Sequence, residues 1–154
     1  MKIKALLVLL FICCAFGVFA DGVDERVRNR LNSKNFQYEI DDENDFKIIV
    51  TLDNGRTQLL WINSNTQKFK NMEIREVWSI GYKGDLSYNI MKTMLRDSET
   101  LKIGAWGTNK DNDRAIFSAK IPANLDADNL IGIIFLVGES ADELEKEFHG
   151  NDDL

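Results

Sequence analysis

Three acidic clusters are the residues of this chain whose types come closest to metal chemistry. They are Asp41-Asp42-Glu43-Asn44-Asp45, Asn109 to Asp113, and Asn124 with Asp126 and Asp128. A calcium-binding EF-hand loop needs glycine at its sixth position and a bidentate glutamate at its twelfth. The sixth positions here are Phe46, Arg114 and Asn129, and the twelfth positions are Leu52, Lys120 and Phe135. We therefore expect turn and helix-cap residues in these clusters, and no metal site.

Residues suited to nucleophilic catalysis are scarce. The single histidine is His149, and both cysteines, Cys13 and Cys14, lie within the first twenty residues. Serine–histidine catalysis and multi-histidine metal sites are therefore not expected. The stretch from Gly104 to Gly107 lacks the spacing of a phosphate-binding loop. We expect no enzyme activity and no cofactor, although the 25 acidic residues leave a carboxylate pair of a metal-free hydrolase formally open.

The first twenty residues have the pattern of a secretory signal peptide. A basic start containing Lys2 and Lys4 precedes an apolar block from Ala5 to Phe16, and Ala20 is a small residue at a plausible cleavage point. The block is shorter than the roughly 20 apolar residues that a membrane-spanning helix needs. A lipoprotein cleavage before Cys14 is disfavoured because bulky residues precede it. The sequence predicts an exported protein, periplasmic or secreted, with no stable membrane span in its mature form.

The mature body is acidic. Without Lys2 and Lys4 it has 17 basic and 25 acidic residues, a formal charge of −8. Nucleic-acid binding requires clustered basic residues, so we expect no nucleic-acid partner and no adhesion to an anionic membrane. Residues 21–150 form one domain of ordinary size, followed by an acidic tail at 151–154. The sequence leaves open whether that tail does more than fray.

The positions of apolar residues predict an α+β domain. An amphipathic helix is expected over 24–32 and a second from the N-cap Asp85. Period-two alternation predicts six strands, at 36–40, 46–52, 57–62, 72–82, 101–107 and 114–121. Strand 57–62 is apolar on both sides, so we expect it to be central and covered on both faces. The order α-β-β-β-β-α-β-β-α with hairpin-length connections favours a single domain with a mostly antiparallel sheet.

The last predicted helix, 125–148, is apolar around most of its circumference. A seam of residues spaced by four and three faces the core: Leu130, Ile134, Val137, Ala141, Leu144 and Phe148. Phe135 lies roughly 140° from Leu130, and Ile131 and Leu136 lie on opposite flanks of the seam. These three are the candidate partner-binding residues. Their cover is either another subunit or protein partner, or the first helix and the loops of the same chain.

Several stretches resemble the YbjN family, whose members share the fold of type III secretion chaperones of the Tir-chaperone type. They are Phe36 to Asp41, Leu52 to Gln58, Gly104 to Gly107, Phe117 to Pro122, and Ala141 to Leu144. The resemblance implies a compact chaperone-like sandwich that often dimerises and binds protein partners. The secretion chaperones are cytoplasmic, so an exported chain is not expected to escort an effector to a secretion machine.

We therefore expect an exported, non-catalytic, chaperone-like or regulatory domain. It would bind a protein or peptide through its sheet and C-terminal helix, and a homodimer is one of the assemblies that the resemblance implies. The alternative is a small-ligand-binding domain with an apolar or aromatic pocket near Trp106. Gly104 and Gly107 flank this tryptophan and allow close approach of the backbone.

Overall fold

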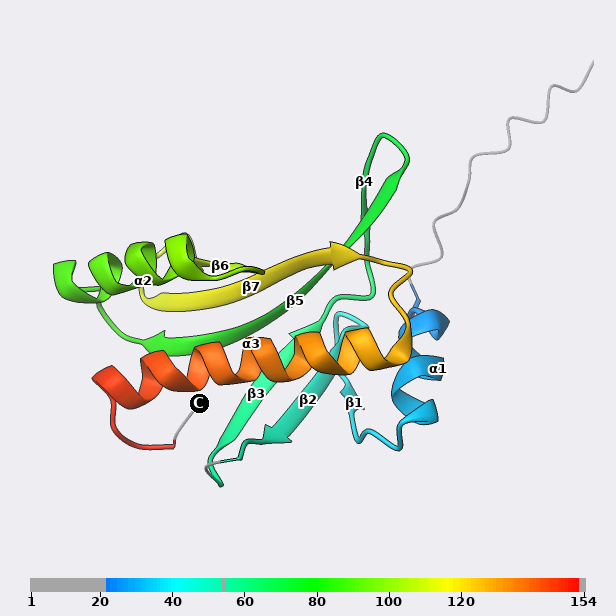
Figure 1. The fold of residues 1–154 in the computed structure, drawn as a ribbon, viewed down its shortest axis with the longest axis horizontal. Helices are drawn as coiled ribbons and strands as arrows, with labels where there is room; N and C mark the ends of the chain where they lie inside the picture. The colour runs from blue at the N-terminus through cyan, green and yellow to red at the C-terminus, as the bar shows by residue number, and fades with distance from the viewer. Residues whose placement is uncertain (1–21, 54, 153–154) are drawn as a thin grey trace, which may run out of the picture.

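The computed structural model describes residues 22–53 and 55–152. The predicted signal peptide at 1–20 and the last two residues of the acidic tail lie outside the described residues. These residues form three helices and seven strands, whose arrangement is drawn in Figure 1. In chain order they are α1 Glu25–Ser33, β1 Glu39–Ile40, β2 Phe46–Thr51, β3 Thr57–Ile62, β4 Gln67–Phe69, β5 Met72–Lys83, α2 Tyr88–Thr100, β6 Ala105–Thr108, β7 Arg114–Pro122 and α3 Ala127–Phe148.

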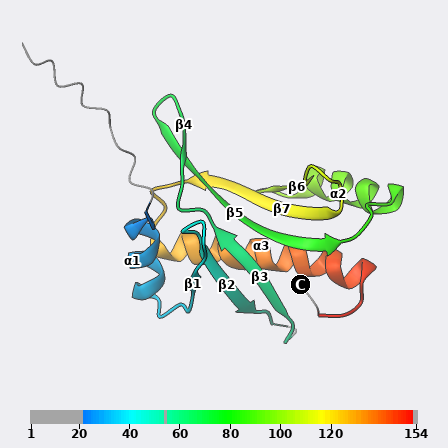
Figure 2. The ribbon, with the colours of Figure 1, turned by 180° about the vertical axis from the view of Figure 1, so that it is seen from behind.

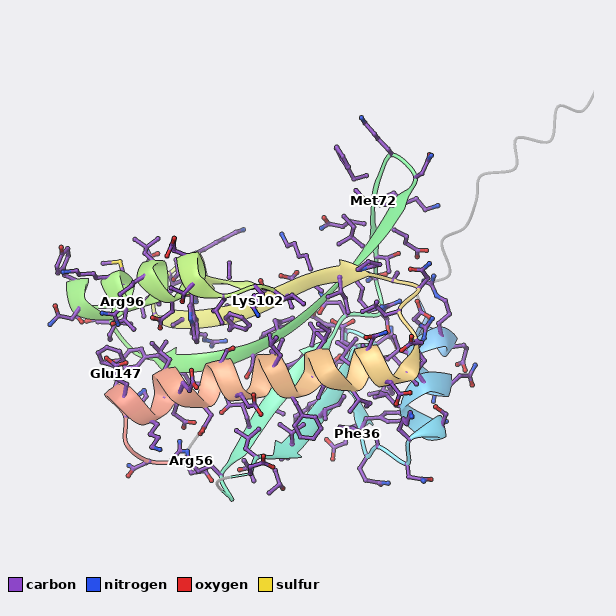
Figure 3. All side chains as sticks on the ribbon, in the orientation of Figure 1. Phe36, Arg56, Met72, Arg96, Lys102 and Glu147 are labelled. Carbon is purple, nitrogen blue, oxygen red and sulfur yellow. The ribbon has the colours of Figure 1, made fainter. Side chains whose placement is uncertain are left out.

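The strands form one antiparallel sheet in the order β1-β2-β3-β5-β7-β6. This confirms the predicted α+β class. β4 was not predicted; it pairs with β5, and Phe69 lies opposite Met72 in a hairpin that projects away from the helices (Figure 3). All three residues of β4, Gln67-Lys68-Phe69, are exposed, so the strand has no buried face that would require alternating apolar residues. A strand of this kind leaves no period-two signal in the sequence.

All three helices pack against the same face of the sheet. The predicted seam of α3 is buried from Leu130 to Leu144, and its last member, Phe148, is half-buried. The seam packs with inward-facing residues of the sheet: Leu60 of β3, Val77 of β5 and Phe117 of β7. Val27 and Leu31 of α1 complete one end of this core. At the other end, α2 contributes Ile90 and Met94 to a second buried cluster with Ala115 and Leu144, which come from β7 and α3.

The structure corrects two local predictions. α2 begins at Tyr88, and its N-cap is Ser87, whose Oγ accepts a hydrogen bond from the Ile90 amide at 3.3 Å. Asp85 lies two residues before this cap, so the prediction that it caps the helix was wrong. β3 is interior in the sheet, as predicted, but its cover is one-sided. Gln58, Leu60 and Ile62 are buried beneath α3, whereas Leu59 and Trp61 on the other face are only half-buried.

The acidic clusters form turns and caps, as predicted. The Asp41 carboxylate accepts hydrogen bonds from the amides of Glu43 and Asp45 at 3.0 and 2.9 Å. The Asn109 side chain accepts hydrogen bonds from two amides in the β6–β7 turn. Asp126 caps α3 through the Asn129 amide at 2.8 Å, and this hydrogen bond lowers the pKa of Asp126. These side chains satisfy backbone N–H groups that have no partner in a helix or a ladder.

We predict that Gly81→Ala destabilises the fold by about 1–3 kcal/mol. A Cβ atom at Gly81 would lie 2.5 Å from Trp106 Cη2 and 2.9 Å from the Ala141 carbonyl oxygen, so β5, β6 and α3 would have to move apart. Gly107→Ala is the matched control, because a Cβ there has no heavy atom within 4 Å. Urea unfolding measures both changes. Equal stabilities for the two variants would contradict the tight packing at Gly81.

Candidate functional site

The face of the sheet opposite the helices has a stacked tryptophan pair at its centre. Trp61 of β3 and Trp78 of β5 are partners in the antiparallel register. Their rings stack with centroids 4.3 Å apart and planes 10° from parallel. Trp78 Nε1 also donates a hydrogen bond to Asn63 Oδ1 at 2.8 Å. Both indoles are half-buried, which leaves the edges of the pair accessible from solvent.

Apolar residues continue from this pair across neighbouring strands. Ile49 of β2 lies opposite Leu59 of β3, and 67% of its surface is exposed. On the far side of β5, Ile116 of β7 pairs with Ile80 and is half-buried. Seen from behind, the strands lie in front of α3, and within 22–53 and 55–152 no helix covers this side (Figure 2). We define Ile49, Leu59, Trp61, Trp78 and Ile116 as the open face.

The predicted partner-binding residues of α3 lie at the margin of the core. Ile131, Phe135 and Leu136 are each half-buried and pack against the main core cluster. The Phe135 ring contacts Phe36 edge-on, with centroids 6.1 Å apart and planes at 84°. The segment after α1 therefore covers part of Phe135. At 100° per residue, Leu136 lies on the opposite flank from Ile131 and Phe135, so the three residues do not form one patch.

Trp106 lines a cleft of about 400 Å³ between α2, β6 and α3. The cleft is lined by Asp97, Thr100, Leu101, Trp106, Ser140, Glu143, Leu144 and Glu147. Gly104 and Gly107, which were predicted to belong to this pocket, are not among its lining residues. A Cβ atom at Gly104 would lie 2.5 Å from Phe117 Cζ, so this glycine serves packing against β7. The lining is more acidic than the apolar or aromatic pocket that the sequence predicts.

A buried charge cluster joins the β2–β3 hairpin to α3. Arg56 lies below the C-terminal half of α3 in Figure 3. It donates hydrogen bonds to Asp142, which is 3% exposed, and, at 3.1 Å, to Glu145, which is 0% exposed. The hydrogen bond to Asp142 raises the pKa of Arg56. Carboxylate oxygens of Asp142, Glu145 and Asp152 lie within 4.8 Å of one another, a spacing that could ligate a cation. The guanidinium of Arg56 already binds these carboxylates, so the cluster is an ion-pair network.

A second buried charge network lies at the start of α1. Arg75 of β5 is 2% exposed and donates hydrogen bonds to the Asp24 carboxylate and to the backbone carbonyls of Asn63 and Ser64. Burial acts to raise the pKa of Asp24. Hydrogen bonds from Arg26 and Arg75 outweigh burial and hold that pKa well below its usual range. Asp24 is also the N-cap of α1, so this network anchors the helix to the sheet.

Sequence reasoning missed both networks and the open face. Arg56 and Asp142 are 86 residues apart, and Asp24 and Arg75 are 51 apart. No local pattern links residues so distant in the chain. A signal for the open face was present, because the alternate residues Leu59 and Trp61 are apolar. It was interpreted as a sign that both faces of the strand are covered.

No family model matches the chain, and no curated protein matches it in sequence. Among solved structures, a chain of the HopA1-SchA chaperone–effector complex matches with a TM-score of 0.51. The match covers 79% of this chain and 91% of that chain, at 12% sequence identity. A likeness at this identity concerns the fold alone. The chain therefore has a chaperone-like α+β fold.

None of the helices in the part of the chain that the structure describes has both the length and the apolar composition needed to cross a bilayer. α3, the longest helix, has buried carboxylates among its apolar residues. Its apolar seam is directed to the sheet.

We predict that Asp24→Asn lowers the free energy of unfolding by about 3 kcal/mol at pH 7, because it removes the carboxylate charge that is hydrogen-bonded to the buried Arg75 guanidinium. Asparagine is also a good N-cap, so the change isolates the charge. The depressed pKa of Asp24 means that its contribution is complete above about pH 5 and is lost as the pH falls below about 4. Urea unfolding from pH 7 to pH 2 measures this difference. Asp111→Asn, in an exposed turn, is the control, and a pH-independent difference would contradict the assignment.

Proposed function

We propose that this protein is an exported, non-catalytic binding domain that holds an extended segment of a protein partner against its open face. The observation that carries the proposal is the stacked pair Trp61–Trp78 on a sheet face without helical cover. Exposed apolar patches centred on aromatic residues are typical of protein-interaction sites. An open sheet also suits an extended segment, because side chains of such a segment alternate with the sheet period.

The comparison with known structures supports the same class of function. The similar chain comes from a complex of a chaperone with an effector, and a protein-binding role is consistent with that source. Membership of the YbjN family is part of the proposal. It rests on the stretches quoted above, two of which form the β2–β3 hairpin and the β6 strand. Export rests on the signal-peptide pattern of residues 1–20.

The margin of α3 is a secondary contact region in this proposal. Ile131 and Phe135 present half-buried apolar surface on the α1 side of the helix. A homodimer would cover such surface, and size-exclusion chromatography with light scattering measures the assembly directly. A dimer that Phe135→Asp converts to a monomer would support this contact, and a strictly monomeric wild type would contradict it.

A small-ligand site in the Trp106 cleft is the alternative function. Its support is the cleft of about 400 Å³, a size that accommodates a small molecule. Purification from the native source followed by mass spectrometry separates the two functions. A co-purifying protein favours the open face, and a bound small molecule that Trp106→Ala releases favours the cleft.

We predict that Ile49→Glu abolishes capture of the protein partner by the immobilised domain, because it would place a charge on the most exposed apolar side chain of the open face. Loss of at least about tenfold in the captured amount is expected, the size of an interface hot-spot effect. Tyr88→Glu is the matched control, since Tyr88 is 72% exposed on α2 and away from the open face. Circular dichroism verifies that both variants are folded.

The outcome that would contradict the proposal is equally specific. Capture that survives Ile49→Glu and Trp61→Glu but is lost with Tyr88→Glu would move the binding surface to α2. Capture that is lost only with Phe135→Asp would move it to the margin of α3.

A further inference from the structure

The sheet is split between β3 and β5. The two strands pair only where Leu60–Ile62 of β3 meets Val77–Ser79 of β5. Beyond this stretch β5 has a register shift between Ile80 and Tyr82 and follows β7 away from β3. In the β2–β3 hairpin the Leu52 amide bonds to the Arg56 carbonyl. By antiparallel alternation, the next amide, that of Thr57, therefore points away from β2 and into the split.

The segment after α3 crosses this split. His149 stacks on Tyr82 of β5 with ring centroids 4.5 Å apart, and its Nε2 accepts a hydrogen bond from the Lys83 amide at 3.4 Å. On the β3 side, the Asp152 carboxylate accepts hydrogen bonds from the Thr57 amide at 3.1 and 3.2 Å. We define residues 149–152 as the C-terminal strap. In Figure 1 the strap runs from the end of α3 back toward the open end of β3.

Arg56 fixes the strap near its middle. Its Nη2 donates a hydrogen bond to the Asn151 carbonyl at 2.7 Å, while the same guanidinium binds Asp142 and Glu145 of α3. The strap thus ties the end of the β2–β3 hairpin to β5 beyond the ladder. It adds to the buried Gln58 side chain, which donates hydrogen bonds to Ser79 Oγ at 3.0 Å and to the Ile80 carbonyl at 2.8 Å. Its four residues are exposed, apart from these contacts, and bury no large apolar side chain. Segments held by few, solvent-accessible hydrogen bonds open at low free energy compared with the core.

The two halves that the strap joins carry different parts of the open face. Ile49 and Leu59 belong to the β2–β3 hairpin, and Trp78 and Ile116 belong to the β5–β7 half. Leu59 is only two residues from Thr57, so a movement of the hairpin at the strap changes the position of Leu59 relative to Trp78. The engaged strap holds Arg56 and Thr57 at the end of the hairpin. Without it, the hydrogen-bonded links between β3 and β5 among the described residues are the Leu60–Ile62 ladder and the side-chain hydrogen bonds of Gln58 and Ser79.

We propose that the C-terminal strap is a conformational clasp that sets the geometry of the open face. The effect of the clasp on partner binding rests on the proposed function. The effect of the strap on the position of the hairpin does not depend on any partner. Binding of an extended segment to both halves of the open face would favour one hairpin position and so couple to the strap. Residues 149–152 are therefore part of the binding device in this proposal.

Two measurements test the clasp, and neither uses a partner. Amide hydrogen exchange followed by NMR reports on the strap contact. Asp152→Ala removes the acceptor of the Thr57 amide hydrogen bond, and we expect the Thr57 amide to exchange about tenfold faster or more. Electron-spin distance measurements report on the hairpin. Both native cysteines lie in the first twenty residues, so mature protein carrying Asp53→Cys and Asp85→Cys takes spin labels at those two positions alone. We expect Asp152→Ala to broaden their distance distribution and shift it to longer distances.

Two further variants serve as controls for Asp152→Ala. Asp111→Ala removes an equal charge from an exposed turn and should change neither measurement. His149→Ala releases the other anchor and should shift the label distance as Asp152→Ala does. Faster exchange of the Thr57 amide with an unchanged label distance would mean that the strap only protects that amide, and it would overturn the clasp. No change in either measurement would overturn it as well. Failure to capture any partner would instead contradict the proposed function and leave these results unaffected.

Discussion

The placement of all three helices on one side of the sheet is the constraint on which the rest of the structure depends. It divides each strand into residues that pack under α3 and residues that face away from it. Inward positions such as Leu60, Val77 and Phe117 are fully buried, so they belong to the main core. The outward positions have no such cover within the described residues, yet several remain apolar. Water contact with these side chains is unfavourable in the free protein, and a partner that covers them gains that burial free energy.

Charge, in contrast, fixes where the helices sit. Arg56, in the β2–β3 turn, binds carboxylates of α3, and Arg75, on β5, binds the carboxylate of Asp24 at the N-cap of α1. Buried ion pairs contribute little net stability compared with apolar residues of similar size, but an unpaired buried charge is costly. An arrangement of α3 or α1 shifted by one turn would leave such a charge unpaired. The two networks therefore specify one position for each helix, while apolar contact supplies most of the stabilisation.

The functional proposal combines these two features. One-sided cover leaves the stacked tryptophans accessible, and the Arg56 network holds the C-terminal strap at the split between β3 and β5. The fold itself is shared with a chain of a chaperone–effector complex at 12% identity, a level at which sites diverge while backbones persist. For this reason Ile49, Trp61 and Trp78 are the residues from which we propose partner binding, and the shared fold only supports that proposal.

The sequence by itself determined the elements and the class of the fold. Period-two and helical spacings depend on contacts within a few residues, so the seam of α3, the β2–β3 hairpin and the acidic turns were all correctly predicted. Local patterns failed where two neighbouring signals competed, as at Asp85 and Ser87, or where a strand such as β4 was short and polar. Only the tertiary structure decided which sheet face is covered, which cleft Trp106 lines, and which carboxylates Arg56 and Arg75 bind. Arg56 and Asp142 are 86 positions apart and Asp24 and Arg75 are 51 apart, and such pairing depends on chain topology, which no local spacing records.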